Sequence, residues 1–268
     1  DRGAKVPWIE FQAENGLTNA KVIGPNRDRY DGNHIEAEAI GRKAVWLEKT
    51  GDFVAFKATE TGNSLVVRFS IPDAPTGGGI DSTLGVYVDD KRVTSLKLTS
   101  RYSWVYGGET LSTPNDPGLG QPHTFFDEAR TLLTEFPAGT EIRLQRDAED
   151  NAAFYVIDLI DLEKVGPALA KPEGLVSITD FGAIANDTID DGVAIQKAIN
   201  SVIDKKGRGV WIPAGTFIVN TLLDDKGFFL NVSGMDFRGA GMWYSNITGK
   251  KASFACFNAG GCKFSDFA

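Results

Sequence analysis

The stretch SITDFGAIANDTIDDGVAIQKAINSVIDKKGRGVWIPAGTFIV, from Ser177 to Val219, decides the fold of the second half of the chain. Its apolar residues in Val193–Ile203 recur at the three- and four-residue spacing of an amphipathic helix. Two lysines suit the negative end of this helix, and Gly207 stops it. Val210–Ile212 is a short apolar run that ends in a Pro-Ala-Gly corner. The pattern predicts a strand, an acidic turn, a helix over about 189–205 and a second strand.

The acidic turn contains the start signal of this helix. Thr188 and Asp191 stand three residues apart, as in a capping box with Asp in place of Glu. Asp190 and Asp191 also place negative charge at the N-terminal end of the helix, where it is stabilising. A capping role for this acidic pair is therefore favoured over a catalytic one.

The same stretch carries several short motifs, namely Asp180-Phe181-Gly182-Ala183, Asp190-Asp191, Ala194-Ile195-Gln196, Ala198-Ile199 and Ile212-Pro213-Ala214-Gly215-Thr216-Phe217. In this combination they resemble the opening of the pectate-lyase-like right-handed β-helix superfamily. The resemblance implies that the helix caps the N-terminal end of a solenoid, whose first coil otherwise exposes an unpaired edge and an apolar end. The superfamily includes glycosidases, lyases and phage tailspikes, so this resemblance alone names no reaction.

The composition is that of an ordinary globular protein. The chain has 268 residues, of which 42% are hydrophobic and 24% charged, and its net charge is -8. This charge disfavours a polyanion as main partner, so we expect no nucleic-acid binding, and a neutral polysaccharide is compatible with it. No apolar run approaches about 18 residues, so we expect no membrane span. The opening DRGAKVPWIE contains no leader, as expected of a mature secreted protein or a shortened one.

The first part of the chain contains many short strand patterns and hardly a helix. They are Trp8–Phe11, Ala44–Leu47, Phe53–Phe56, Ser64–Ile71, Thr83–Val88, Ser95–Leu98, Glu141–Leu144 and Phe154–Leu162. Turn residues such as Lys49-Thr50-Gly51-Asp52 separate them. This spacing predicts a β-sandwich.

Five segments of this part, Phe11–Glu14, Gly41–Val45, Thr50–Val54, Val67–Asp73 and Ile157–Val165, resemble a carbohydrate-binding module of the family 6/35 type, a jelly-roll β-sandwich. The resemblance covers most of residues 8–165 and implies a structural calcium ion between the first and last strands. Its ligands would be Gln12, Glu14 and Asp161, with backbone carbonyls. Gln12 stands where many members have Glu, which lowers the charge of the site. The alternative is that Glu14 and Asp161 are merely solvated.

The segment Ser100–Gly107 places three aromatic residues close together, Tyr102, Trp104 and Tyr106. They are the candidate carbohydrate-binding residues, because aromatic rings can stack on the C–H faces of sugars. The same rings can instead plug the end of the sandwich or pack against the following domain, and the sequence favours packing.

The two cysteines, Cys256 and Cys262, stand six residues apart. They can form a disulfide or remain buried free thiols in successive strands. Free burial is slightly favoured, because cysteine packs well as a small apolar residue. With two histidines and no Cys/His group, a zinc site is not expected.

The boundaries follow from these patterns. We expect a carbohydrate-binding-module-like sandwich over 1–165, a semi-rigid Pro-containing linker over 166–174 and the first coils of the β-helix over 175–268. The last part has short apolar strands punctuated by Gly and Asn, enough for three or four coils. A catalytic domain of this superfamily has more coils, so we expect the chain to be the N-terminal part of a longer enzyme.

Three further segments, Ser100–Gly107, Phe126–Arg130 and Phe237–Ile247, narrow the family. A sandwich of this type followed by this β-helix resembles the bacterial α-1,3-glucanases (mutanases and mycodextranases) of glycoside hydrolase family 87. The resemblance implies that both modules form one catalytic unit and that hydrolysis is inverting. The catalytic aspartates of that family lie on later coils, and no stretch of this chain matches them.

Two more acidic pairs are candidate catalytic groups. Asp224-Asp225 precedes Lys226-Gly227 and is interpreted as a turn. Asp127-Glu128 is interpreted as part of a local salt bridge with Arg130. The catalytic residues therefore stay unassigned.

We expect the chain to be the N-terminal portion of a secreted enzyme that hydrolyses α-1,3-glucan. Its expected partners are this polysaccharide and the remaining β-helix of the same protein. Two alternatives are open. The chain can be a non-catalytic carbohydrate-binding module, or part of another β-helix enzyme, a β-1,3-glucanase or a lyase.

Overall fold

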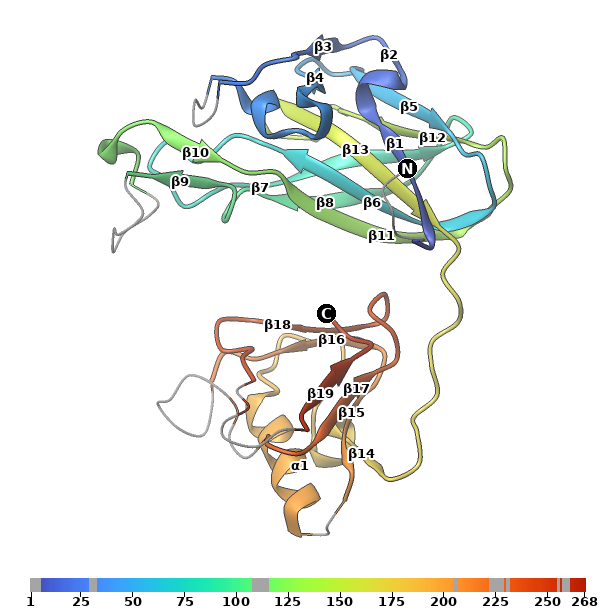
Figure 1. Cartoon of the computed structure of the whole chain (residues 1–268), viewed down its shortest axis with the longest axis vertical. Helices are drawn as coiled ribbons and strands as arrows, with labels where there is room; N and C mark the ends of the chain where they lie inside the picture. The colour runs from blue at the N-terminus through green and yellow to red at the C-terminus, as the bar shows by residue number, and fades with distance from the viewer. Residues whose placement is uncertain are drawn as a thin grey trace. The chain divides into compact units, whose positions relative to one another are not determined.

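The computed structural model describes residues 6–28, 33–107, 116–204, 207–221, 229, 232–254, 256 and 261–268. The chain divides into two compact units, Asp1–Val165 and Gly166–Ala268. Figure 1 shows the first unit in blue to yellow and the second in yellow to red. Strands are the main regular secondary structure of the described residues, which contain one α-helix, and this confirms the predicted, mostly β, fold class.

The first unit is a sandwich of two antiparallel sheets (Figure 1). One sheet has the order β11-β6-β13-β4-β3, with β1 also paired to β13. Its strands are β1 (Trp8–Gln12), β3 (Lys21–Ile23), β4 (Ala44–Leu47), β6 (Gly62–Ser70), β11 (Asp127–Phe136) and β13 (Tyr155–Glu163). The other sheet has the order β2-β5-β12-β7-β8. Its strands are β2 (Leu17–Thr18), β5 (Phe53–Lys57), β7 (Asp81–Val88), β8 (Lys91–Thr99) and β12 (Glu141–Gln145).

The strands form because apolar residues recur at every second position and can share one buried face. Leu65, Val67 and Phe69 of β6 meet Ile142 and Leu144 of β12 in the main core of the sandwich. All five side chains are at most 1% exposed. The alternation read from the sequence thus sets which face of each sheet is buried.

A second, smaller apolar cluster lies outside this core. It gathers Ile35, Ala39, Ala44, Trp104, Tyr106 and Val156, with Trp46 and Phe154 packed against it. Its chain segments include the 3-10 helix η2 (Ile35–Glu38) and the strand β9 (Trp104–Tyr106), which pairs with β10 (Pro122–Thr124). The remaining 3-10 helices of this unit are η1 (Ala13–Asn15), η3 (Ile40–Arg42) and η4 (Pro117–Leu119).

The second unit stacks parallel strands, as the β-helix resemblance implied. The strands β14 (Leu175–Ser177), β15 (Gly209–Ile212), β17 (Asp236–Gly239) and β19 (Lys263–Ser265) form one parallel sheet, and β16 (Gly215–Ile218) pairs with β18 (Ser245–Thr248) in another. The register aligns Val176, Val210, Phe237 and Phe264 in one row. The rings of Phe237 and Phe264 stack at 5.2 Å between centroids. Such rows of like residues are typical of stacked coils, and in this one Val210 and Phe237 are buried while Phe264 is 44% exposed.

The helix α1 (Gly192–Asp204) packs its buried residues Ile195, Ala198, Ile199 and Val202 into the core of the second unit (Figure 1). This arrangement fits the predicted cap of the solenoid. In the described part of the chain, no helix is long and apolar enough to cross a membrane.

The start of α1 differs from the predicted one. Its first residue is Gly192, so Thr188 is not the capping residue. The backbone carbonyl of Asp191 accepts the Ile195 N–H at 2.9 Å, which places Asp191 at the helix start. The carboxylate of Asp191 accepts the N–H groups of Ile184 and Ile218, both at 2.9 Å. Because these bonds fix Asp191 in the preceding loop, the helix begins only after it.

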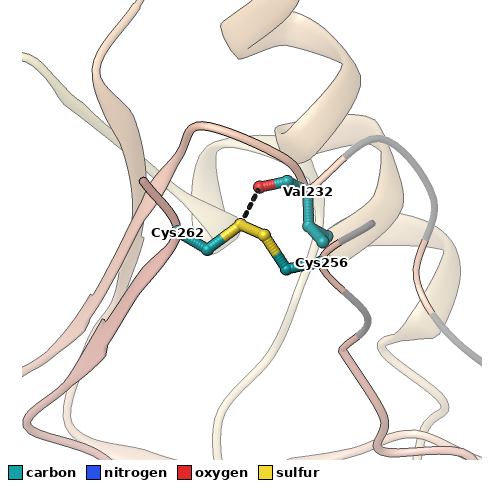
Figure 2. The surroundings of a disulfide bond; sticks show 3 residues. All are labelled: Val232, Cys256 and Cys262. Atoms are coloured by element: carbon teal, nitrogen blue, oxygen red, sulfur yellow. Dashed lines mark hydrogen bonds between the residues drawn. A yellow bond between two sulfur atoms is a disulfide. The ribbon is translucent and has the colours of Figure 1, made fainter. Parts of the chain in front are cut away.

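Cys256 and Cys262 form a disulfide, so the expectation of free buried thiols is wrong (Figure 2). That expectation assumed that both side chains lie in the core. Instead Cys256 is exposed and Cys262 is only half-buried, with its sulfur 3.4 Å from the carbonyl oxygen of Val232. At the surface, the apolar packing of a free thiol gives no advantage over a covalent link between neighbouring coil segments.

Candidate functional site

The three residues predicted to bind calcium come from adjoining parts of the first unit. Gln12 ends β1, and Glu14 lies in η1 directly after it. Asp161 lies in β13, which pairs with β1 so that Asp161 stands opposite Glu10. Because alternate residues of a strand share a face, Gln12 and Asp161 lie on the same face of this sheet. The register thus brings together residues almost 150 positions apart.

Two of these side chains bury an oxygen atom that lacks a hydrogen bond. Gln12 Oε1 and Glu14 Oε2 are inaccessible to solvent and have no hydrogen-bond partner among the described residues. The Gln12 amide nitrogen donates to Glu10 Oε1 at 2.5 Å. An unsatisfied buried polar atom costs roughly 1–3 kcal/mol. Carboxylate and amide oxygens are calcium ligands, so these residues fit the implied ion.

Gly41 lies next to the carboxylate of Glu14 and has no side chain that would contact it. Its backbone φ is 72°, and a Cβ atom there would lie 3.4 Å from Glu14 Oε1. Within the described residues, no group of three His, Cys, Asp or Glu side chains is arranged to hold a metal. The predicted set has two acids, so it depends on the Gln12 amide and on backbone carbonyls to complete a coordination shell.

Asp158 is a fully buried acid that interacts electrostatically with Glu14. It is the extra residue of a bulge in β13. Its carboxylate accepts the Ile40 N–H at 3.1 Å and forms an ion pair with Arg68. Burial raises the pKa of Asp158 to about 6, and the bonds from Ile40 and Arg68 only partly oppose this rise.

The three candidate carbohydrate-binding aromatics lie in different environments. Trp104 is 9% exposed, and its indole N–H donates to the Ile71 carbonyl at 2.9 Å. Tyr106 is 8% exposed, and its hydroxyl donates to Asp73 at 2.9 Å. Burial, together with this bond to Asp73, raises the pKa of Tyr106 to about 12. Tyr102 is 75% exposed. These positions favour packing for Trp104 and Tyr106, and an accessible ring only for Tyr102.

Like the carboxylate of Asp191, the carboxylate of Asp190 is held by hydrogen bonds within the protein. Its carboxylate accepts the Thr221 hydroxyl at 2.6 Å and the Gly192 N–H at 2.9 Å. Burial opposes ionisation, but the hydrogen bonds from Thr221, Gly192 and Asn220 outweigh it and lower the pKa of Asp190. A carboxylate held ionised in this way is a poor general acid.

Of the other two acidic pairs, the structure describes Asp127-Glu128 and not Asp224-Asp225. Asp127 and Glu128 are consecutive residues of β11, so their side chains point to opposite faces and cannot converge on one substrate. Asp127 Oδ1 accepts the N–H of Glu128 at 2.8 Å. Asp224 and Asp225 lie outside the described residues.

A groove of about 950 Å³ lies in the first unit beside Trp46. Its walls are the edge strand β3 with the residues before it, the start of η2 and the turn after β4. Trp46 is not among the residues predicted from the sequence, although its position in β4 carries a signal. In β4, Val45 and Leu47 belong to the main core, so the residue between them faces outward.

Two family models match the chain, and their limits follow the two units. The α-1,3-glucanase catalytic domain D1 matches residues 5–165. The rhamnogalacturonase A/epimerase, pectate lyase-like family matches residues 175–262. No curated protein matches the chain significantly.

Several solved structures are similar to the chain over nearly its whole length. The Agl-KA catalytic domain has a TM-score of 0.82 and 29% identity, over 99% of this chain and 45% of its own. The catalytic unit of a thermostable GH87 α-1,3-glucanase from Streptomyces thermodiastaticus strain HF3-3 has a TM-score of 0.78 and 31% identity, over 99% and 44%. A GH87 α-1,3-glucanase catalytic domain in complex with nigerose has a TM-score of 0.73 and 27% identity, over 93% and 42%. The chain spans less than half of each of these structures.

Proposed function

Because the chain belongs to the α-1,3-glucanase family through its catalytic domain D1, we propose that it is the N-terminal part of a glycoside hydrolase that cleaves α-1,3-glucan with inversion. One observation carries this proposal. Both units align together with the Agl-KA catalytic domain and with the catalytic unit of a GH87 α-1,3-glucanase over 99% of the chain, at 29% and 31% identity. A carbohydrate-binding module alone would match in the first unit only.

In this proposal, the catalytic carboxylates lie outside residues 1–268. Inverting hydrolysis needs one carboxylic acid and one carboxylate roughly 6.5–9.5 Å apart, with a water molecule between them. Asp190 and Asp191 are bound to backbone N–H groups at the start of α1, and Asp127 and Glu128 point apart. Asp190 and Asp191 therefore stabilise the fold, and the first coils serve as the base on which later coils stack.

The substrate is tested by supplying the longer protein, with its further coils, with insoluble α-1,3-glucan, β-1,3-glucan and polygalacturonate. We expect soluble sugar from α-1,3-glucan only. Release from β-1,3-glucan or from polygalacturonate instead would contradict the proposed linkage and favour another β-helix enzyme.

We further propose that the first unit binds a structural Ca²⁺ through Gln12, Glu14 and Asp161. The buried oxygens of Gln12 and Glu14 support it, because a cation compensates both at once. The position of Asp161 on the same face as Gln12 supplies a second carboxylate. The ion would link the first and last strands of the sandwich and thereby stabilise the unit against unfolding.

The calcium proposal is tested by thermal unfolding in calcium and in chelator. A ligand at 100 times its Kd stabilises the native state by about 2.7 kcal/mol, so we expect Tm to rise by about 5 °C or more in calcium. The Glu14→Gln variant should lose this rise, and Glu60→Gln, at an exposed acid of the same unit, should keep it. An equal Tm with and without calcium in the unmodified protein would refute the site.

We infer that the protein acts outside the cell. The disulfide between Cys256 and Cys262 supports this, since such bonds persist in oxidising compartments. Fractionation of producing cells should find the enzyme in the medium, and its retention in the cytosol would contradict the inference.

A further inference from the structure

Asn15 is the last residue of η1, and its side chain is exposed. Among the described residues, no hydrogen bond or ion pair holds its amide group. Asn19 is exposed as well, but its amide donates to the Gly51 carbonyl at 3.0 Å and accepts the Phe53 N–H at 2.9 Å. The amide of Asn15 is therefore able to turn toward its own backbone, whereas the amide of Asn19 is held in place.

The residue after Asn15 is glycine because the chain passes close to β5 at this point. A Cβ atom at Gly16 would lie 2.8 Å from the carbonyl oxygen of Ala55 and 3.0 Å from a methyl carbon of Val54. The next residue, Leu17, pairs with Ala55, so the chain cannot move away without disturbing the pairing of β2 with β5. The φ of Gly16 is -76°, which any residue can adopt, so the requirement for glycine is steric.

Glycine at this position also leaves its backbone nitrogen open to the asparagine side chain. The missing Cβ atom removes the steric barrier between this nitrogen and the amide carbon of Asn15. In the structure, the N–H of Gly16 donates to the Ala13 carbonyl at 3.0 Å. This bond closes a 3-10 helix of three residues, a form with poor hydrogen-bond geometry, and the ends of such short elements open at little free-energy cost. Opening this one bond makes the nitrogen available for reaction.

We infer that Asn15 is a site of spontaneous deamidation in the folded protein. The Gly16 nitrogen, after loss of its proton, attacks Cγ of Asn15, so that a C–N bond forms, the side-chain amide leaves as ammonia and a succinimide ring results. Water then cleaves one of the two C–N bonds of this ring. The product is either aspartate or isoaspartate, in which the main chain runs through the former side-chain carbon. The reaction consumes water, releases ammonia and involves no redox change, and the inference is independent of the proposed function.

The position of Asn15 makes the isoaspartate product destabilising. The residue lies between β1 of one sheet and β2 of the other, where the chain crosses the sandwich. On one side of it Ala13 is fully buried in the main core, and on the other side Leu17 is paired with β5. Isoaspartate adds one methylene group to the backbone between these two fixed points. The close-packed surroundings cannot accommodate this group without moving one of them.

The test incubates the 268-residue chain with chelator in warm, mildly alkaline buffer and follows its amides by mass spectrometry. Trypsin releases Asn15 and Asn19 in one peptide, residues 6–21, so Asn19 is an internal control. We expect Asn15 to lose its amide first, and faster at higher pH because the attacking nitrogen must lose its proton. Asn19 should keep its amide. The Asn15→Gln variant should not be modified, because its longer side chain forms the ring far more slowly, and it should keep the Tm of the unmodified chain.

Equal retention of both amides in the folded chain would overturn the inference, and so would loss of the Asn15 amide only after unfolding in urea. The structural consequence is measured on the isoaspartate fraction, after its separation by chromatography. This fraction should have a lower Tm than the Asn15→Asp variant, which has the same added charge and a normal backbone. Equal Tm values for the two would contradict the effect assigned to the extra backbone atom.

Discussion

Buried polar atoms in the first unit are of two kinds. The hydroxyl of Tyr155 lies in the core, 2.7 Å from Ser82 Oγ, and also accepts the Ala152 N–H at 3.1 Å. By contrast, Gln12 Oε1 and Glu14 Oε2 have no hydrogen bond among the described residues. Native structures satisfy nearly all buried polar atoms, so these two unsatisfied oxygens support the proposal of a bound cation. This contrast is the physical basis of the calcium proposal.

Asp158 gives a prediction for the pH dependence of stability. Because burial raises its pKa in the folded protein from 3.8 to about 6, the folded state binds more protons than the unfolded state between these values. Stability should therefore fall as pH rises from about 4 to 6, by up to about 3 kcal/mol for this group. Asp158→Asn should remove this part of the slope.

Urea unfolding in chelator at several pH values between 4 and 7 measures the effect. Glu128→Gln serves as the control because Glu128 is exposed, and it should keep the slope of the unmodified protein. If Asp158→Asn leaves the slope unchanged, the carboxyl group is not the buried proton acceptor described above.

Among the elements, the corner between β15 and β16 shows how a local motif sets the path of a coil. Pro213, Ala214 and Gly215 follow the last residue of β15, and β16 begins at Gly215. Gly215 has a φ of 135°, and a Cβ atom there would lie 2.4 Å from the Cβ of Ala185. The corner therefore needs glycine for its backbone conformation and for the close approach of the preceding loop.

Replacing Gly215 by alanine should destabilise the second unit, because the backbone conformation is strained for alanine and the new Cβ atom would clash with Ala185. Gly182→Ala is the matched comparison, because Gly182 has a φ of 102° and no atom within 4 Å of the added Cβ. We expect about 1–2 kcal/mol of strain for Gly182→Ala and clearly more for Gly215→Ala. Chemical unfolding of both variants measures the difference, and equal losses would show that the contact with Ala185 is unimportant.

The elements also show what the sequence could predict. Helix α1 and the corner after β15 were found because their signals are local, within a few residues. The start of α1 was missed because the bonds of Asp191 to Ile184 and Ile218 depend on tertiary structure. The disulfide was missed for a similar reason, since spacing alone does not reveal whether Cys256 is exposed.

For the site, residue types were easier to predict than their environments. The resemblance named Gln12 and Glu14, but only the strand register and burial show that their oxygens lack partners. The segment around Trp104 was selected for its aromatic content, and its burial became visible only in the structure. Trp46 was missed although it lies between two core residues and faces away from the main core, because one half-buried Trp in a strand is a weak signal by itself.

At the scale of the whole molecule, the chain spans less than half of the catalytic domains that it resembles. Its two units match two different family models, and both align together with solved catalytic domains that are more than twice as long. The described acids at the start of α1 have structural roles. The described residues form the sandwich and the capped first coils, and we propose that the bond is cleaved on later coils.

The most direct measurement follows sugar release from insoluble α-1,3-glucan by proton NMR, with the 268-residue chain and the longer protein in parallel. The account predicts that the chain adsorbs without releasing sugar, while the longer protein releases sugars whose new reducing ends appear first as the β-anomer. Release by the chain alone, abolished by Asp190→Asn or Asp191→Asn in a folded variant, would contradict the account and place catalysis at the start of α1.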